Sequence, residues 1–400
     1  MSLATDWVAL YRDLHRHPEL GFEERRTAGL VAEHLGAAGF EVEEGVGTTG
    51  VVGVLRNGEG PTVLVRADMD ALPVTEKTGL DYASEVPGVA HACGHDVHTT
   101  CLLAACHELA ETKETWRGTL LAVFQPAEEL GIGAKAMLDD GLYERHGTPI
   151  VVLGQHVAPL PAGTVGLHAG ASFSALDRLD ITLHGVGGHG SQPQTTVDPV
   201  VMAASTVMKL QTVVARETSP SDFAVVTVGK LTAGTKANII PDEANLEVTI
   251  RSYRDEVRQQ VLASIDRIVR GEAAAAGAPK PPDVLHVEAV DAVHNDPAAC
   301  AATQPALAST GVLVVDPGPV PGSEDVGCFA TAAGAPCVYW LLGGADPVHF
   351  EGLTSLQEFA DRVRTLPSNH SPEYAPVTDP TIRNGIAALV AATRHWLPTS

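Results

Sequence analysis

Residue types suited to metal binding are concentrated in one short segment, residues 91–100 (HACGHDVHTT). Three histidines, one cysteine and one aspartate lie within eight residues there. Cys93 and His95 flank a glycine, whose backbone freedom allows both side chains to turn towards one point. Thiolate and imidazole together suit zinc or another divalent transition metal. The alternative is a helix start with solvated histidines, but the density of ligand types favours a metal site.

Carboxylates and further histidines follow other predicted strands. Asp68 and Asp70 come just after an apolar strand, and their period-two spacing directs both carboxylates to one side. Glu128 and Glu129 also end a strand, and one carboxylate of such a pair can bind metal while its neighbour holds a water. Each feature alone is typical of a charged turn. Two more histidines, one after an apolar run and one in a C-terminal loop, complete the set: His156 and His370.

The elements that must position these residues alternate between strands and helices. Apolar strands are expected at 50–55, 62–67, 120–124 and 150–156, with the first two as neighbours. Helices are expected at 7–38 (with an interruption), 98–110 and 134–139, and a final strand at 335–344 precedes a Pro- and His-rich loop and a helix near 382–396. This alternation predicts an α/β domain with a mainly parallel sheet covered by helices. Ligands of such sheets gather at the strand ends.

The middle of the chain has a different pattern. Strands at 179–184, 224–231, 244–252 and 284–290 and helices at 199–217 and 256–276 give the order β-α-β-β-α-β. We expect an inserted α+β, ferredoxin-like domain at 179–291 within a catalytic domain formed by 1–178 and 292–400. The alternative is that the first sheet simply continues. The insertion carries a Gly-rich segment without the Gly-Lys-Ser/Thr of a phosphate loop, and three candidate polar residues: His189, Asn238 and Arg251.

Composition excludes several partners. Against 49 acidic residues the 400-residue chain has only 26 Lys and Arg, a net charge of −23. This balance argues against a nucleic-acid groove and a polybasic membrane contact. Six cysteines without a C-x-x-C pattern, no signal peptide and no apolar run long enough for a span predict a cytoplasmic protein.

Taken in order, these segments resemble the metal-dependent aminoacylase/amidohydrolase/carboxypeptidase family. The likeness is to its branch of N-acyl-amino-acid amidohydrolases, such as hippurate hydrolase and the auxin-conjugate hydrolases. It covers nearly the whole chain, from LHRHPELGFEE (14–24) through RADMDALP, ACGHDVH, QPAEE, GQHV, GGHGSQP, NIIP and SED to NHSP. Each motif is short, but nine of them in order are highly specific.

The resemblance implies a role for each candidate. Glu128 matches the general base, and Asp70 the carboxylate that orients a ligand imidazole. His189, Asn238 and Arg251 match substrate contacts, and in the family the histidine reaches the partner subunit's active site, which implies a homodimer through the inserted domain. Five residues match metal ligands, and this number implies two divalent ions, zinc or manganese with cobalt or nickel as alternatives: Cys93 (the bridge), His95, Glu129, His156 and His370.

The implied activity is hydrolysis of the amide bond of an N-acyl-amino acid by a metal-activated water, with Glu128 as general base. Arg251 would clamp the substrate carboxylate, because a guanidinium fork matches it. The chain departs from the family at three positions that bear on the acyl group: Leu130 and Ile132, where glycine often follows the glutamate pair, and Val326, where an aromatic residue is common.

Other functions remain open at this point. A dipeptidase or carboxypeptidase would use the same two-metal site, and a catalytically inactive protein would bind metal only. A Cys93 thiolate nucleophile assisted by His95 is a further alternative. Hydrolysis by metal-activated water is favoured because the base and all five matched ligands are present.

Overall fold

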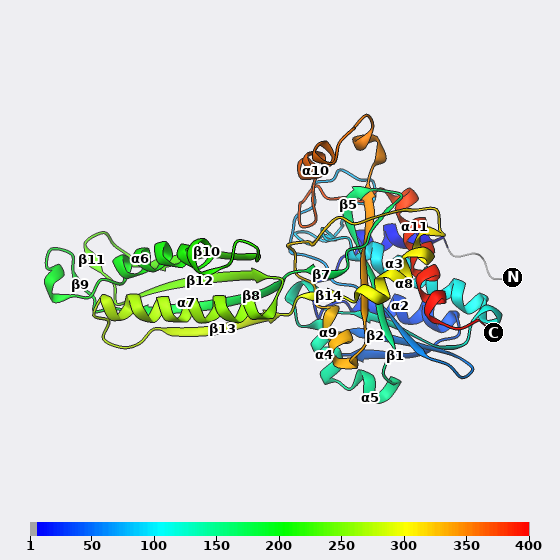
Figure 1. Cartoon of the computed structure of the whole chain (residues 1–400), viewed down its shortest axis with the longest axis horizontal. Coiled ribbons are helices and arrows are strands. Elements are labelled where there is room, and N and C mark those ends of the chain that lie inside the picture. The colour runs from blue at the N-terminus through cyan, green and yellow to red at the C-terminus, as the bar shows by residue number, and fades with distance from the viewer. Residues whose placement is uncertain (1–5, 400) are drawn as a thin grey trace. The chain divides into compact units, whose positions relative to one another are not determined.

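The computed structural model describes residues 6–399 and divides the chain into two compact units (Figure 1). The first unit takes its described residues from Met1–Gly170, His294–Gly318 and Asp325–Ser400. The second comprises Ala171–Val293 and Pro319–Glu324. The insertion expected at 179–291 lies within the second unit, which also takes in the short 319–324 segment.

A mainly parallel sheet forms the centre of the first unit, as predicted. Its principal strands lie in the order β1 (Glu41–Val46), β2 (Gly50–Asn57), β4 (Gly118–Gln125), β3 (Thr62–Asp68), β5 (Val151–Pro161) and β16 (Cys337–Ala345). β3 runs parallel to β4 and β5, and β16 runs parallel to β5, whereas β1 and β2 are antiparallel additions. Short strands β6 (Thr164–Gly166), β14 (Val293–Asn295) and β15 (Leu313–Val315) extend it.

The prediction that strands 50–55 and 62–67 are neighbours was wrong. β4 lies between β2 and β3 and hydrogen-bonds to both. The reason is the crossover through α3 (His95–Glu111), which returns the chain to the sheet beside β3 and parallel to it. Local sequence carries no signal for such an insertion.

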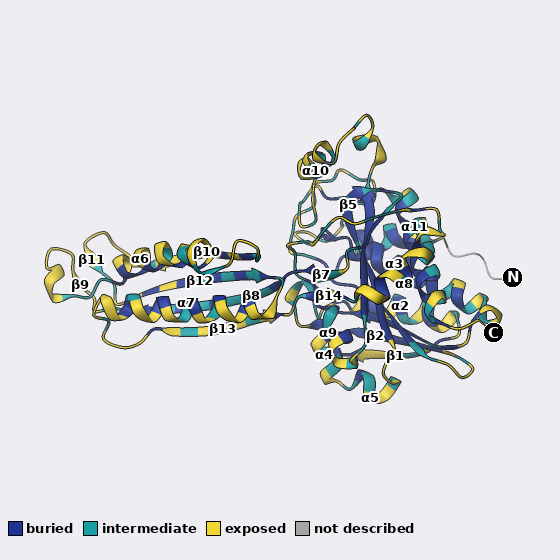
Figure 2. Cartoon of the chain, in the orientation of Figure 1, coloured by how far each residue is buried: buried dark blue, intermediate teal, exposed yellow. Residues whose placement is uncertain are grey.

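Helices cover this sheet. α1 (Trp7–Arg16), α2 (Arg25–Ala37) and α11 (Thr378–Trp396) pack against α3, which also contacts β3 and β5. α3 is therefore buried along most of its length, including its first residues, and the strands beneath it are buried on both faces (Figure 2). The remaining helices are α4 (Gly133–Asp139), α5 (Leu142–His146), α8 (Pro297–Ala308) and α9 (Gly327–Ala333).

Helices α5 and α8 were not predicted, and neither was a helix after β16. The segment after β16, expected to be a loop, contains α10 (Leu356–Thr365) and a 3₁₀ turn at Pro347–Phe350. Ser355 and Glu358 form a capping box at the start of α10. That S-x-x-E spacing was the available signal, and the surrounding Pro- and His-rich composition obscured it.

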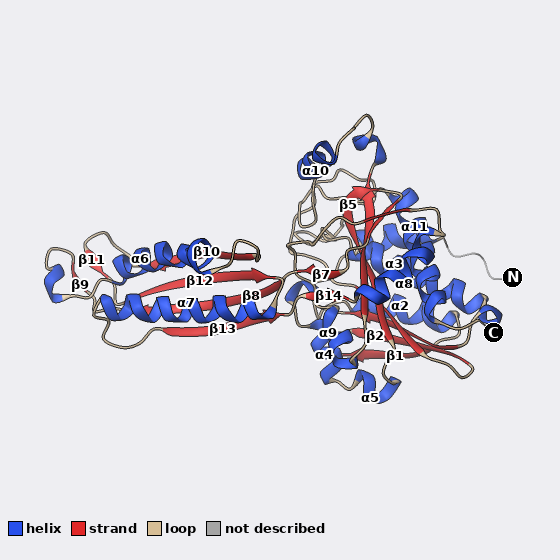
Figure 3. Cartoon of the chain, in the orientation of Figure 1, coloured by secondary structure: helices blue, strands red, loops and turns tan. Residues whose placement is uncertain are grey.

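The second unit has the predicted β-α-β-β-α-β order (Figure 3). It consists of β8 (Ala175–His184), α6 (Pro199–Thr212), β10 (Ala224–Ala233), β12 (Glu243–Ser252), α7 (Asp255–Ala275) and β13 (Asp283–Val290). The preceding strand β7 (Gly170–Phe173) belongs to the larger sheet. The four long strands form a separate antiparallel sheet in the order β10-β12-β8-β13. The alternative of one continuing sheet is therefore wrong.

Alternating burial along β8 and β12 packs one sheet face against α6 and α7. Two shorter strands, β9 (Gly188–His189) and β11 (Ile239–Ile240), pair with each other. Among residues 6–399 there is no helix both long and apolar enough to cross a membrane.

Candidate metal centre

The segment between Cys93 and His95 turns as the glycine suggested. Gly94 has φ 88°, in the left-handed region, and immediately precedes α3. A Cβ at this position would lie 2.4 Å from Val157 Cγ1, so no larger residue fits. The chain passes against the end of β5 here, and this brings the Cys93 thiol beside the last polar residue of that strand, His156.

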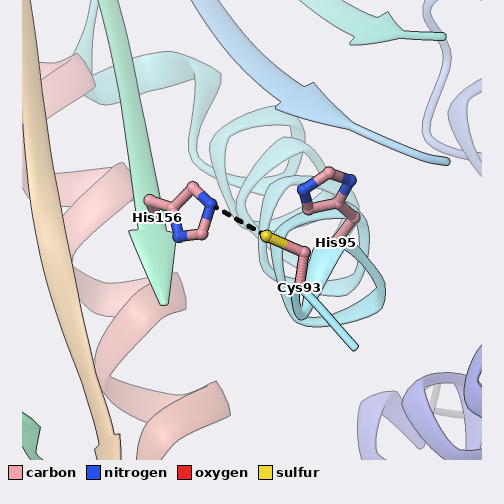
Figure 4. Close-up of side chains that lie close together, drawn as sticks. All are labelled: Cys93, His95 and His156. Carbon is pink, nitrogen blue, oxygen red and sulfur yellow. Dashed lines mark hydrogen bonds between the residues drawn. The ribbon is translucent and has the colours of Figure 1, made fainter. Parts of the chain in front are cut away.

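Cys93 lies at the centre of the predicted ligands. The possible ligand atoms of Cys93, His95 and His156 lie within 4.8 Å of one another, and Cys93 Sγ is 3.5 Å from His156 Nε2 (Figure 4). Cys93, Glu129 and His370 form a second group of the same size. His370 Nε2 is 3.4 Å from Glu129 Oε2. All five predicted ligands thus come together in the first unit, with Cys93 common to both groups.

Two buried atoms in the cluster indicate that a metal fits there. His95 Nε2 and Glu129 Oε1 are shielded from solvent and hydrogen-bond to none of residues 6–399. Buried polar atoms normally have a partner, so two such atoms facing one cluster point to a bound species. Nitrogen, thiolate and carboxylate ligands together suit a divalent transition ion.

The charges around His95 also call for a cation. Burial lowers the pKa of His95, but the carboxylates of Asp68, Asp70 and Glu129 outweigh that effect and raise it to about 10. Burial, Glu129 and Glu128 raise the pKa of the Cys93 thiol well above its ordinary value. A thiolate nucleophile activated only by His95 is therefore disfavoured, because reactive cysteines need a lowered pKa.

Asp70 links two of the predicted ligands. Its Oδ1 lies 3.2 Å from His95 Nδ1, and its Oδ2 accepts a hydrogen bond of 3.0 Å from the backbone N–H of Glu129. The carboxylate thereby fixes the imidazole with Nε2 towards the cluster. Asp70 thus has the contacts expected of the orienting carboxylate.

The other two histidines of the segment 91–98 lie outside the two ligand groups built on Cys93. His98 Nδ1 is 2.6 Å from Asp68 Oδ1, and its Nε2 accepts a hydrogen bond of 2.8 Å from the backbone N–H of Val157. The two ring nitrogens therefore contact two neighbouring strands, Asp68 at the end of β3 and Val157 within β5. The His91 side chain is buried, and neither of its ring nitrogens hydrogen-bonds to the described residues. Counting histidines could not separate these roles, because they depend on tertiary partners.

Several supporting residues were missed at the sequence level. Asn369 donates to the carbonyls of Cys93 and Val157 at 2.9 and 3.1 Å, which ties the C-terminal loop to the cluster. Buried Arg66 donates to Asp68 at 2.7 Å and to Asp325 at 3.1 Å. Only their membership of the NHSP, RAD and SED motifs could have identified them.

The second unit holds the three other candidates at two places. His189 and Asn238 are adjacent: β9 pairs with β11, and Gly190 N donates to the Asn238 carbonyl at 2.9 Å. Arg251 lies elsewhere, on β12, and donates to Pro321 O at 3.1 Å and Ser323 Oγ at 2.9 Å. The strand register pairs Glu243 with His184 at one end of the sheet and Arg251 with Leu176 at the other.

A parallel-sheet unit with buried Cys, His and carboxylate ligands at its strand ends, interrupted by a ferredoxin-like unit, defines a class of metal-dependent hydrolases. Residues 64–367 match the model of peptidase family M20/M25/M40, and the chain belongs to this family. It is an amidohydrolase that binds divalent metal, and the family resemblance of its motifs is confirmed.

Three similar proteins agree with this assignment. The chain is 34% identical to N-acetylcysteine deacetylase of Bacillus subtilis, over 95% of this chain and 98% of that protein. It is 42% identical to hippurate hydrolase of Campylobacter jejuni, over 69% and 72% of the two chains. A crystal structure of a dinuclear metal-binding peptidase of the M20 family from Bacillus subtilis matches with a TM-score of 0.78 at 29% identity, covering 97% and 96%.

Proposed function

We propose that the protein hydrolyses the amide bond of N-acyl-amino acids. The observation that carries this proposal is the group of donor atoms around Cys93, with Glu128 beside it. By their names, two relatives remove acyl groups from N-acetylcysteine and hippurate. Two divalent ions would be held by five residues, of which Cys93 belongs to both groups of donor atoms: Cys93, His95, Glu129, His156 and His370.

Zinc is our first choice of metal because a thiolate is among the ligands. Manganese, cobalt or nickel are the alternatives that the carboxylate and imidazole ligands also suit. Ligation requires Cys93 to be reduced, which supports placing the protein in the cytoplasm.

When bound, the ions act as Lewis acids that polarise the amide carbonyl and make a water more acidic. Glu128 is the group that takes the proton from the attacking water and returns it to the leaving amine. Its largely buried carboxylate lies 3.8 Å from His95 Nε2, so it faces the ligands while following β4 on a short 3₁₀ turn. His189 would donate to the oxygen that becomes negative on the carbonyl.

The positions within the second unit support a homodimer. His189 and Asn238 lie at the end of the sheet where β12 begins, whereas Arg251 is eight residues further along that strand. Eight strand residues span roughly 27 Å, too far for one small substrate to contact both ends. We therefore propose that one subunit supplies Arg251 for the amino-acid carboxylate and its partner supplies His189 and Asn238.

The proposal is tested with a substrate panel on the purified protein after metal analysis. N-acetyl- and N-benzoyl-amino acids with free carboxylates should be hydrolysed, and the corresponding amino-acid amides, which lack the carboxylate, should have a higher KM. Failure to cleave any N-acyl-amino acid at full metal occupancy would contradict it.

A peptidase is the second candidate, since one similar structure is of a protein described as a peptidase. It would use the same ligands and base. Dipeptides included in the same panel decide between the two: preference for dipeptides over their N-acetyl counterparts by tenfold or more in kcat/KM would favour the peptidase.

A further inference from the structure

The turn that carries Glu128 and Glu129 is strained at its first residue. Ala127 has φ 49°, a left-handed conformation that residues with a Cβ rarely adopt, and it is completely buried. Such a conformation persists only when its surroundings hold it. The contacts that hold Ala127 therefore determine where the two glutamates lie.

Three carboxylates from separate segments accept backbone N–H groups of this turn and of α4, the helix that follows it. Asp70 accepts from Glu129 N at 3.0 Å and Asp325 accepts from Ala134 N at 3.0 Å. The third is Glu24, whose Oε1 accepts from Ala127 N at 2.8 Å. Glu24 is thus the carboxylate bound at the strained residue itself.

Glu24 occupies the N-cap position of α2 but makes no side-chain capping bond there. A residue at this position would ordinarily accept from the first turn of its own helix. Glu19 does so instead, accepting from Arg26 N at 2.9 Å and Thr27 N at 2.8 Å. The Glu24 side chain is completely buried, and its second oxygen accepts from Thr49 Oγ1 at 2.5 Å. The Glu24 side chain therefore stabilises the turn at Ala127 and does not cap its own helix.

The loop before Glu24 is fitted closely to the same turn. A Cβ on Gly21 would lie 3.1 Å from the Cα and Cβ atoms of Ala127. The Glu19 carbonyl also accepts from Ala71 N at 2.8 Å, next to Asp70. The segment 19–24 thereby contacts both the loop of the orienting carboxylate and the turn of the base.

We propose that Glu24 is a positioning residue for the reaction: its carboxylate holds Ala127 in the left-handed conformation that sets Glu128 and Glu129 at the metal centre. This inference rests on the proposed function for the role of Glu128. Both of its carboxylate oxygens accept hydrogen bonds from the protein, so it is not among the proposed metal ligands. Its length and its hydrogen-bond acceptor, not its charge, are the properties that matter.

The test compares Glu24→Asp with Glu24→Gln. Aspartate keeps the charge but is one methylene too short to reach both partners, whereas glutamine keeps the length and one acceptor oxygen for Ala127 N. We expect Glu24→Asp to lower kcat by roughly tenfold to a hundredfold, with KM within about threefold of the wild-type value. Glu24→Gln should stay within about threefold of the wild type in both.

Glu19→Asp and Glu19→Gln are the matched controls, because they alter a carboxylate of the same loop that also binds two backbone N–H groups. They should lower the melting temperature without changing kcat. The outcome that overturns the proposal is a Glu24→Asp enzyme with wild-type kcat, or a Glu24→Gln enzyme as slow as Glu24→Asp.

A spectroscopic readout separates this proposal from the proposed function. Because Glu129 follows Ala127 by two residues, movement of the turn should alter the visible absorption of the cobalt(II)-loaded protein. We expect an altered spectrum for Glu24→Asp and an unaltered one for Glu24→Gln and both Glu19 variants. If the wild type cleaves no N-acyl-amino acid, the proposed function fails, and the spectra still decide the role of Glu24: identical spectra for Glu24→Asp and the wild type overturn it.

Discussion

The two units hold their candidate residues in opposite ways. In the first unit the predicted ligands and their supports are mostly buried and held by several contacts, as Asp70 holds both His95 and the backbone of Glu129. In the second unit His189 and Asn238 are exposed: His189 lies on the two-residue strand β9, and Asn238 directly precedes its partner strand β11. Under the proposed function this difference corresponds to a division of labour: the first unit holds the metal centre, and the second presents exposed side chains for substrate.

Removal of metal should have the largest effect, and it should act on the first unit. Incubation with a strong chelator should abolish hydrolysis and lower the melting temperature by roughly 10 °C, since a tightly bound ion stabilises by about 4 kcal/mol or more. The ligands lie in the first unit only, so calorimetry should show the shift in that unit's transition. Full activity in the chelator, after metal analysis confirms loss, would contradict the metal mechanism.

The next largest effect is expected from loss of His189, which should impair turnover without affecting the metal centre of the first unit. His189→Ala should lower kcat by about a hundredfold, the loss expected for an oxyanion donor, and leave metal content and melting temperature unchanged. His286→Ala, at another exposed histidine of the same unit, is the control and should leave kcat unchanged. Loss of metal in His189→Ala would contradict this account, because it would mean that His189 supports the metal centre.

Loss of the Asp70 carboxylate should weaken metal binding more than it destabilises the fold. In Asp70→Asn one oxygen is replaced by an amide group, so one of the two contacts, to His95 Nδ1 or to Glu129 N, is impaired. We expect metal affinity, measured by competition with a chromophoric chelator, to fall about tenfold to a hundredfold. Asp139→Asn, at an exposed aspartate, should leave the affinity unchanged; an unchanged Asp70→Asn affinity would mean that Asp70 does not orient the ligand.

A smaller effect, on the stability of the first unit, is expected from His15. His15 lies between Asp96, at 2.7 Å, and Glu76, at 3.2 Å. Burial lowers the pKa of His15, but these carboxylates outweigh it and raise the pKa to about 10. A pKa raised on folding stabilises the protein fully below the unfolded value of about 6.5, and this contribution is lost as the pH rises through about 10.

Comparison of the wild type with His15→Gln in denaturant tests this pH dependence. The wild type should be more stable by about 3 kcal/mol near pH 6, and the difference should shrink steadily towards pH 10. His17→Gln, at a more exposed histidine two residues away, is the control and should destabilise the protein by less. If the stability difference between the wild type and His15→Gln grew with pH, a raised pKa of His15 would be contradicted.

Part of the site could be predicted because it depends on local chemistry. The Cys93–Gly94–His95 bend and the glutamate pair after β4 follow from residue type, glycine freedom and strand ends, whereas the orienting role of Asp70 was implied only by the family resemblance. The βαββαβ order of the second unit also followed from periodicity alone. The features that could not be predicted depend on tertiary partners. β4 lies between β2 and β3, and the ring nitrogens of His98 contact Asp68 and the backbone N–H of Val157. Glu24 likewise had no predicted role beyond its place in the LHRHPELGFEE motif, because its contact with Ala127 is tertiary.

The central claim is that Glu128 moves protons while its neighbour holds metal. The most direct measurement is metal content and kcat for Glu128→Gln and Glu129→Gln, prepared side by side and compared with the wild type. We predict that Glu128→Gln retains the wild-type amount of metal and loses kcat by a hundredfold or more, whereas Glu129→Gln loses metal. Near-normal turnover in Glu128→Gln with metal bound would contradict the account.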